Sequence, residues 1–167
     1  MVLEAPDGTV AAYGPDGQKL FESRWDEMAY AGDGLFAVCQ GNKIGFADLT
    51  GQEIIPCLYE LPWETYSLPF EYGLGVVRDG EWEVGVIDLT GRVVIPFAWD
   101  SASVMGEFLV AKRGEEDGVC VMNHSGTVLV TLPWDDETTT MAVTDRYLAV
   151  VQDGLLTIYD SQGEVVY

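Results

Sequence analysis

The sequence predicts an all-β protein built from five three-stranded antiparallel repeats. Turn glycines recur at a nearly constant spacing, short apolar runs rich in Val, Ile, Leu and Tyr lie between them, and an aromatic–acid pair follows the turn at a fixed distance in four copies. Apolar runs of this kind, bounded by turn residues, are typical of strands. Helical periodicity is weak, so we expect at most one helical turn in the linkers at residues 24–30 and 63–68.

The repeat is defined by five turn glycines, which are Gly17, Gly51, Gly91, Gly126 and Gly163. Their spacings are 34, 40, 35 and 37 residues. Three residues before the glycine, the five copies carry Gly14, Asp48, Asp88, Asn123 and Asp160. Asp or Asn at the first position and Gly at the last favour a type I turn, and Pro at the second position of the first copy favours it too. We therefore expect five equivalent turns.

An aromatic residue stands eight positions after the turn glycine and a carboxylate follows it. The pairs are Trp25–Asp26, Tyr59–Glu60, Trp99–Asp100 and Trp134–Asp135. One interpretation is structural, with the ring packed between neighbouring repeats and the carboxylate accepting hydrogen bonds from loop N–H groups. The other is functional, with rings and acids lining a face that stacks on sugars or cationic side chains. The regular spacing favours the structural interpretation.

Further turn signals divide each repeat into three strands. The first strands are expected at 1–3, 35–39, 74–77, 108–111 and 147–151, the second at 10–13, 44–47, 84–87, 119–122 and 155–159, and the third at 19–21, 53–55, 93–95, 128–131 and 164–167. A single domain over 1–167 would then contain repeats at about 1–33, 34–72, 73–105, 106–144 and 145–167.

Five repeats suit a β-propeller-like closed array, and an open β-solenoid stack is the alternative. If each third strand groups with the next two strands, residues 164–167 would complete a blade with the N-terminal hairpin. That split blade would close the ring and remove exposed sheet edges, which favours closure.

Charge is the extreme feature of the composition. The chain has 28 acidic and 8 basic residues, giving a formal net charge of -20. Direct binding to nucleic acid or to an anionic membrane is disfavoured because both need clustered cations. A basic protein surface would be attracted, whereas the simpler interpretation is that the charge maintains solubility. With no signal peptide and no apolar run of membrane-spanning length, we expect a cytoplasmic protein.

The run GVIDLTGRVVIP at residues 85–96, followed by an aromatic–acid pair, resembles the WG repeat family of bacterial proteins. The resemblance covers nearly the whole chain and is most specific in two copies, through Gly45, Asp48, Gly51, Ile55, Pro56 and Tyr59 and through Gly85, Asp88, Gly91, Ile95, Pro96 and Trp99. The tryptophan that names the family is replaced by Ile44 and Val84. The resemblance implies a scaffold or binding module and confers no catalytic residues.

The residues needed for catalysis are sparse. His124 is the only histidine and lies in a predicted surface turn, and the three cysteines, at 39, 57 and 120, form no Cys-x-x-Cys pair. There is no glycine-rich phosphate loop. The acid clusters at 115–117 and 135–137 lack the alternating ladder of a calcium loop and are interpreted as solvated acids. We expect neither an enzyme nor a bound metal or cofactor.

The sequence therefore predicts a non-enzymatic protein-binding module whose acidic surface engages a basic protein. A sharper form of this hypothesis is an inhibitor or immunity-type protein, and the alternative is a lectin-like module for glycans or other small ligands. Contact candidates are aromatic residues that the repeat does not require and the acid clusters, namely Trp63, Tyr66, Phe70, Tyr72, Trp82, Glu115, Glu116, Asp117, Asp135, Asp136 and Glu137. The sequence does not decide the oligomeric state.

Overall fold

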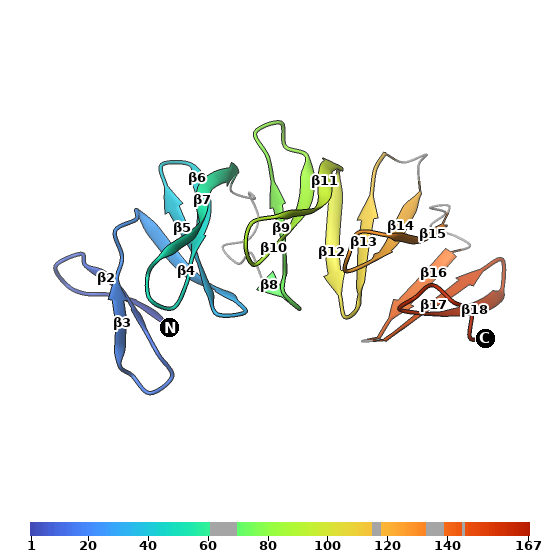
Figure 1. Cartoon of the computed structure of the whole chain (residues 1–167), viewed down its shortest axis with the longest axis horizontal. Coiled ribbons are helices and arrows are strands. Elements are labelled where there is room, and N and C mark those ends of the chain that lie inside the picture. Colours follow the sequence, from blue (N-terminus) through green and yellow to red (C-terminus); the bar gives the residue numbers. More distant parts are fainter. Residues whose placement is uncertain (61–69, 115–117, 133–138, 145) are drawn as a thin grey trace. The chain divides into compact units, whose positions relative to one another are not determined.

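The computed structural model describes residues 1–60, 70–114, 118–132, 139–144 and 146–167 (Figure 1). These residues form antiparallel strands and no helix, so none of the described segments is a helix that could span a membrane. The all-β prediction is confirmed. The strands are β1 Val2–Glu4, β2 Val10–Tyr13, β3 Lys19–Glu22, β4 Glu27–Gly32, β5 Leu35–Gln40, β6 Lys43–Ala47, β7 Glu53–Glu60, β8 Phe70–Glu71, β9 Leu74–Arg78, β10 Val84–Asp88, β11 Val93–Trp99, β12 Ser101–Met105, β13 Phe108–Lys112, β14 Val119–Asn123, β15 Val128–Leu132, β16 Thr139–Val143, β17 Tyr147–Gln152 and β18 Leu155–Asp160.

The contacts divide the chain into two compact units. Unit 1 contains Met1–Trp82 with Ile87–Arg92, and unit 2 contains Glu83–Val86 with Val93–Tyr167. In unit 1, β1–β2–β3 form one sheet and β4–β5–β6–β7 pair in order, while β8 pairs with β9. In unit 2, β12–β13–β14–β15 and β16–β17–β18 each form a sheet. We call these groups blade 1 (β1–β3), blade 2 (β4–β7), blade 4 (β12–β15) and blade 5 (β16–β18).

The number of strands per repeat differs from the prediction. Blades 2 and 4 have four strands, because β4 and β12 pair with the strands expected to come first. The segment at 24–30 was expected to be a linker with at most a helical turn, but most of it belongs to β4. The added strand has a physical reason. Without it, the strand predicted to come first in each repeat would leave a row of unpaired backbone N–H and C=O groups at the edge of the sheet. The linker at 63–68 lies outside the described residues.

In blades 2 and 4, the strand predicted as the third of its repeat pairs with the strand predicted as the second of the same repeat. β7 pairs with β6 and β15 pairs with β14. In blade 5, Val166 N donates to Ile158 O and Ile158 N donates to Tyr167 O, both at 2.8 Å. The C-terminal segment is thus bonded within its own blade. Closure of the array through a split blade stays a prediction.

Each unit has a core that is shared by neighbouring blades. In unit 1 the buried cluster comprises Ala12 of blade 1, Trp25 of the connection, and Phe36, Val38 and Ala47 of blade 2. In unit 2 the cluster comprises Phe108, Val121 and Leu132 of blade 4 and Leu148 and Val150 of blade 5. A blade therefore buries its apolar face against the next blade, as expected of stacked repeats.

The five turns have the same backbone geometry. In every copy the glycine N donates to the carbonyl O three residues earlier, at 2.9 to 3.1 Å, and the glycine has φ between 78° and 82°. Where the first turn residue is Asp or Asn, its Oδ1 accepts further backbone hydrogen bonds; Asp88 Oδ1 accepts from Thr90 N at 2.9 Å and from Arg92 N at 3.0 Å. In the first copy, Asp16 Oδ1 supplies part of this role by accepting from Gln18 N.

Four of these glycines also touch the third strand of the preceding repeat. A Cβ added to Gly51 would lie 2.7 Å from Phe21 Cγ, and one added to Gly91 would lie 3.2 Å from Ile55 Cγ1. A Cβ added to Gly126 would lie 2.7 Å from Val94 O, and one added to Gly163 would lie 3.2 Å from Leu129 Cβ. We call this contact the glycine joint. Gly17 has the same turn, but an added Cβ there would meet nothing within 4 Å. The glycine is therefore required twice, for its positive φ and for the close approach.

The glycine joint can be tested by comparing Gly126→Ala with Gly154→Ala. Both glycines lie in unit 2 with φ of 79° and 78°, but only Gly126 approaches a neighbouring strand. We expect Gly154→Ala to lower the free energy of unfolding by about 1–2 kcal/mol through left-handed backbone strain. Gly126→Ala should cost about 1–3 kcal/mol more because the methyl group collides with the Val94 carbonyl. Urea unfolding measures both, and equal losses would contradict the joint.

The acidic turns predict a loss of stability in acid. The hydrogen bond from the Thr90 hydroxyl holds the pKa of Asp88 below its ordinary value of 3.8, and the Thr50 hydroxyl does the same for Asp48. A lowered pKa in the folded state contributes stability above the unfolded pKa, and this contribution is lost as pH falls through the folded value. Asp88→Asn should therefore destabilise the protein less at pH 3 than at pH 7, as measured by urea unfolding.

Asn123 provides the reciprocal control for this prediction, because an amide already occupies the same turn position in blade 4. Asn123→Asp should add acid-dependent stability where the natural chain has none at that position. If neither substitution changed the dependence of unfolding on pH, the turn carboxylates would not be the groups that titrate.

Candidate functional site

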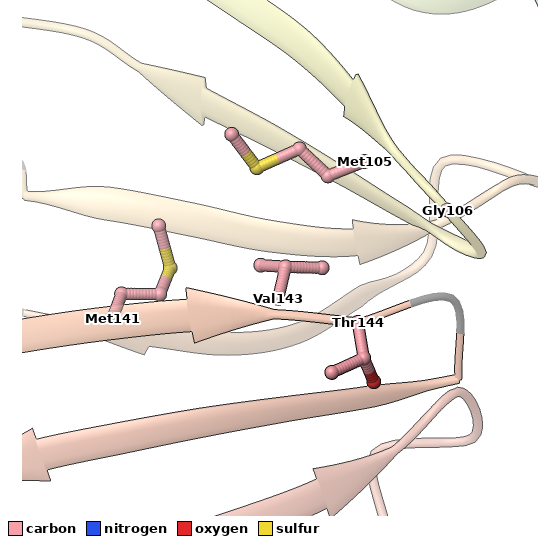
Figure 2. Close-up of a pocket in the computed structure, with 5 residues that line it drawn as sticks. All are labelled: Met105, Gly106, Met141, Val143 and Thr144. Carbon is pink, nitrogen blue, oxygen red and sulfur yellow. The ribbon is translucent and has the colours of Figure 1, made fainter.

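A groove in unit 2 lies between the ends of β12 and β16. It has a volume of about 340 Å³ and is lined by Met105, Gly106, Met141, Val143 and Thr144. Figure 2 shows the Met105 side chain extending from one strand and Met141 and Val143 from the other, with both thioethers directed into the space between them. Met105 is 40% exposed, and Met141 and Val143 also pack against the blade 4–blade 5 core. The groove is therefore an open extension of that core.

Strand register explains why the groove is open here. Met105 pairs with Phe108 at the start of β13, as Gly32 pairs with Leu35 at the start of β5. Val143 pairs with Leu148 in the same way that Phe70 pairs with Gly75. Met105 and Val143 of unit 2 thus hold the register positions that Gly32 and Phe70 hold in unit 1.

The corresponding junction in unit 1 is closed. A Cβ added to Gly32 would lie 2.2 Å from Phe70 O, so the two backbones are in direct contact. Asp33 Oδ2 accepts a hydrogen bond from Gly73 N at 2.8 Å across the same junction. In unit 2 a methionine replaces the glycine, and a smaller aliphatic side chain replaces the phenylalanine. The methionine side chain prevents the direct backbone contact that Gly32 makes, and in unit 2 the groove lies at this place.

The groove is lined mainly by apolar and uncharged groups. Its lining side chains carry no titratable group, and the Thr144 hydroxyl already donates to Tyr147 O at 3.1 Å and accepts from Tyr147 N at 3.0 Å. The Gly106 carbonyl accepts from His124 Nε2 at 2.7 Å, so that nitrogen carries the proton. Methionine side chains are flexible and polarisable and adapt to apolar partners of varied shape. The groove suits an apolar side chain.

The aromatic contact candidates are not gathered into one site. Phe70 is 2% exposed and stacks edge-on against Phe46 with ring centroids 4.8 Å apart, so its prediction as a contact residue is wrong. Tyr72 and Trp82 are 56% and 43% exposed, at left-handed φ of 54° and 67°. They lie beyond opposite ends of β9. Trp63 and Tyr66 lie outside the described residues.

Two of the aromatic–acid pairs, at 25–26 and 99–100, make contacts within the fold. Trp25 is 8% exposed within the unit 1 core, with the Arg24 guanidinium over its ring at 4.7 Å. Asp26 Oδ2 accepts from Gly41 N at 2.7 Å, and Asp100 Oδ2 accepts from Gly114 N at 2.6 Å. The carboxylate thus caps the next hairpin turn. Trp99 is half-buried, and its Nε1–H finds no acceptor among the described residues.

The remaining members of the repeat follow this pattern only in part. Tyr59 is half-buried, and burial raises the pKa of its hydroxyl. Glu60 forms an ion pair with Lys43 of the neighbouring strand β6. Trp134 and the acid candidates Glu115, Glu116, Asp117, Asp135, Asp136 and Glu137 lie outside the described residues, so their predicted roles stay predictions.

The described residues offer little reactive chemistry. They contain no group of three or more His, Cys, Asp or Glu side chains placed to hold a metal ion. Cys39 is buried and Cys57 is half-buried, and burial raises the pKa of both thiols. A raised pKa keeps a thiol protonated and unreactive at neutral pH.

Sequence reasoning missed every residue of the groove. Alignment on the turn glycines gives no clear signal, because Gly32 lies 15 residues after its turn glycine and Met105 lies 14 after its own, while Phe70 and Val143 lie 19 and 17 residues after theirs. These exchanges alter residue size at a junction between blades. The effect of residue size on the groove depends on which strand ends face each other. In unit 2 these are the ends of β12 and β16.

The fold defines an all-β repeat protein with a groove between two successive blades of unit 2. Residues 44–81 and 85–107 match the family model of the WG containing repeat. The resemblance to the WG repeat family is therefore confirmed for these residues. No curated protein matches the chain.

Solved structures resemble the chain in fold. A eukaryotic initiation factor has 12% identity and a TM-score of 0.54, with 99% of this chain and 50% of that chain covered. Hsv2 of Kluyveromyces lactis has 14% identity and a TM-score of 0.51, with 96% and 58% covered. The WD40 β-propeller domain of Doa1 has 16% identity, with 99% and 63% covered, but its TM-score of 0.39 is too low to support a structural comparison. The chain spans only about half to three-fifths of these structures, and the likeness concerns the fold alone.

Proposed function

We propose that this protein is a non-enzymatic binding module whose acidic surface engages a basic protein. The observation that carries the proposal is the net charge of -20. Both units share it, with 15 acidic and 5 basic residues in unit 1 and 13 acidic and 3 basic residues in unit 2. Such a field accelerates encounter with a basic partner and disfavours acidic ones.

The placement of the cations supports the same proposal. Four cations each form an ion pair with a carboxylate, namely Lys19, Arg24, Lys43 and Arg92. The electrostatic field of the protein is therefore dominated by the remaining acidic residues. Many acids also have a structural task, since Asp26, Asp48, Asp88 and Asp100 accept backbone hydrogen bonds. Hydrogen bonds from the Thr50 and Thr90 hydroxyls lower the pKa of Asp48 and Asp88, so the chemistry of these turns itself contributes to the acidic surface.

The groove of unit 2 would provide the short-range part of the interaction. Long-range charge governs the association rate, whereas buried apolar contacts govern how long a complex lasts. An apolar side chain of the basic partner would enter between Met105 and Met141. In the sharper form of the proposal, the module is an inhibitor or immunity-type protein that covers a cationic functional site of its partner in the cytoplasm.

A lectin-like module is the alternative. It rests on the exposed rings of Tyr72 and Trp82, each of which could stack on a sugar by itself. Trp25 cannot take part because it is buried in the core. Titration with a panel of mono- and oligosaccharides, followed by tryptophan fluorescence of the natural chain and of Trp82→Phe, tests this alternative. A change in emission that Trp82→Phe abolishes would favour the lectin over the acidic binding module.

The acidic-module proposal predicts binding that weakens with salt and depends on the groove. A basic protein captured on the immobilised chain would be purified and its dissociation constant measured by calorimetry at increasing NaCl. We expect the dissociation constant to rise with salt because screening weakens the attraction. We also expect Met105→Asp to raise it at least about tenfold, the equivalent of about 1.4 kcal/mol.

Leu58→Asp is the matched control, since Leu58 is 63% exposed on β7 of unit 1 and lies outside the groove. It adds the same charge and should leave the affinity nearly unchanged. Binding that is indifferent to salt would overturn the electrostatic proposal, and equal effects of the two substitutions would remove the groove from it.

A further inference from the structure

The groove of unit 2 brings two of the chain's five methionines into one open space. Met105 comes from β12 and Met141 from β16, and Figure 2 shows both thioethers directed into the space between the two strands. Met105 is 40% exposed and Met141 is half-buried. By contrast, Met122 is 2% exposed, and Met28 packs against the unit 1 core. The groove therefore exposes a pair of thioethers to small solutes.

An exposed thioether reacts with peroxides. The sulfur gives an electron pair to one peroxide oxygen, the O–O bond breaks and an S–O bond forms, and with hydrogen peroxide the other oxygen leaves as water after a proton transfer. The sulfur is oxidised and the peroxide is reduced. The groove, with a volume of about 340 Å³, is large enough for hydrogen peroxide to enter. The product is a methionine sulfoxide, in which an apolar side chain has become polar.

The side chains that line the groove offer no hydrogen-bond donor for a sulfoxide oxygen. The Thr144 hydroxyl already donates to Tyr147 O, and the other lining side chains are apolar. In the open groove, water would solvate the oxygen instead. An apolar side chain of a partner would then have to displace this water, and burying a polar oxygen without a hydrogen bond is unfavourable. Oxidation therefore opposes the apolar contact for which the groove is suited.

Oxidation of the two sulfurs has different consequences for the fold. Met141 packs against the buried cluster of blades 4 and 5, which contains Phe108 and Leu148. Met105 pairs with Phe108 at the end of β12, and its side chain extends into the groove. A sulfoxide at Met141 would place a polar group against the core, whereas a sulfoxide at Met105 changes only the groove. Met105 is also the more exposed of the two, so it should react first.

We propose that Met105 and Met141 are a peroxide-sensitive pair, and that oxidation of Met105 to the sulfoxide closes the groove to an apolar partner. The change is reversible, because methionine sulfoxide reductases return the sulfoxide to the thioether. In that reaction the oxygen leaves as water while two thiols of the reductant are oxidised to a disulfide. The loss of partner binding rests on the proposed function of the groove, whereas the order of oxidation and its effect on stability do not.

The order of oxidation is measured on the full chain by peptide mapping after timed exposure to hydrogen peroxide. Met1, which is 63% exposed, is the accessible reference, and Met122 is the buried one. We expect Met105 to react at a rate close to that of Met1. Met141 should react several-fold more slowly than Met105, and Met122 should be protected until the chain unfolds. Oxidation of Met105 no faster than that of Met122 would overturn the proposal.

Urea unfolding separates the roles of the two sulfurs. Oxidation limited to Met105 should leave the urea midpoint unchanged, and further oxidation that includes Met141 should lower it. Met141→Leu keeps an apolar side chain of similar volume but cannot be oxidised, so this fall should disappear. Met28→Leu is the matched control in the unit 1 core, and the fall should persist in it. An equal fall in Met141→Leu and Met28→Leu would remove Met141 from the pair.

The effect on the groove is measured first with Nile red, a neutral apolar dye, and then with the basic protein captured on the immobilised chain. We expect oxidation limited to Met105 to raise either dissociation constant at least about tenfold. The affinity of Met105→Leu, whatever its value, should not respond to peroxide, whereas that of Met28→Leu should respond as the natural chain does. Unchanged binding of Nile red by the oxidised natural chain would overturn the proposal.

Reduction identifies the chemical group that carries the effect. Dithiothreitol alone reverses the oxidation of cysteine to a disulfide but leaves a methionine sulfoxide intact. We therefore expect the affinity for Nile red to return only when both methionine sulfoxide reductases, one for each sulfoxide epimer, are added with dithiothreitol. Recovery with dithiothreitol alone would assign the effect to a cysteine and overturn the proposal. If no basic protein binds the natural chain, the proposed function fails, while the results with Nile red, peptide mapping and urea still decide the present inference.

Discussion

The structure depends on the contact between a turn glycine and the strand of the repeat before it. This joint sets how closely successive repeats approach, because the glycine has no side chain that would hold the two elements apart. Gly126 faces the Val94 carbonyl, and Gly51 faces the ring of Phe21. A substitution at such a glycine changes the turn and the packing together. Stability in this protein is consequently a property of neighbouring repeats rather than of any single blade.

With the joints fixed, the ends of the added strands are free to differ from one junction to another. Gly32 meets Phe70 directly in unit 1, and that junction is closed further by the hydrogen bond between Asp33 and Gly73. In unit 2, Met105 and Val143 take the corresponding places and leave the methionine-lined groove. The same architecture therefore contains one junction that is closed and one that leaves a groove, which is the place where we propose that a partner binds.

The acidic character of the protein has a structural origin in part. Asp48 and Asp88 are placed at turns because a carboxylate oxygen accepts several backbone hydrogen bonds there, and Asn123 shows that an amide can do the same. Choosing the acid over the amide adds charge without changing the turn. Repeated over the chain with few cations, this choice produces the negative field on which the proposed recognition of a basic partner rests.

The sequence by itself determined the features that depend on local geometry. The β class, the turn glycines and the capping acids Asp26 and Asp100 follow from spacing and turn chemistry, which act within a few residues. Only the tertiary structure decided the fourth strand of the blade, the burial of Phe70 and the groove beside Met105. Edge pairing, burial and space between strand ends depend on segments that are distant in sequence. The size of a side chain such as Met105 has no meaning until the fold decides what faces it.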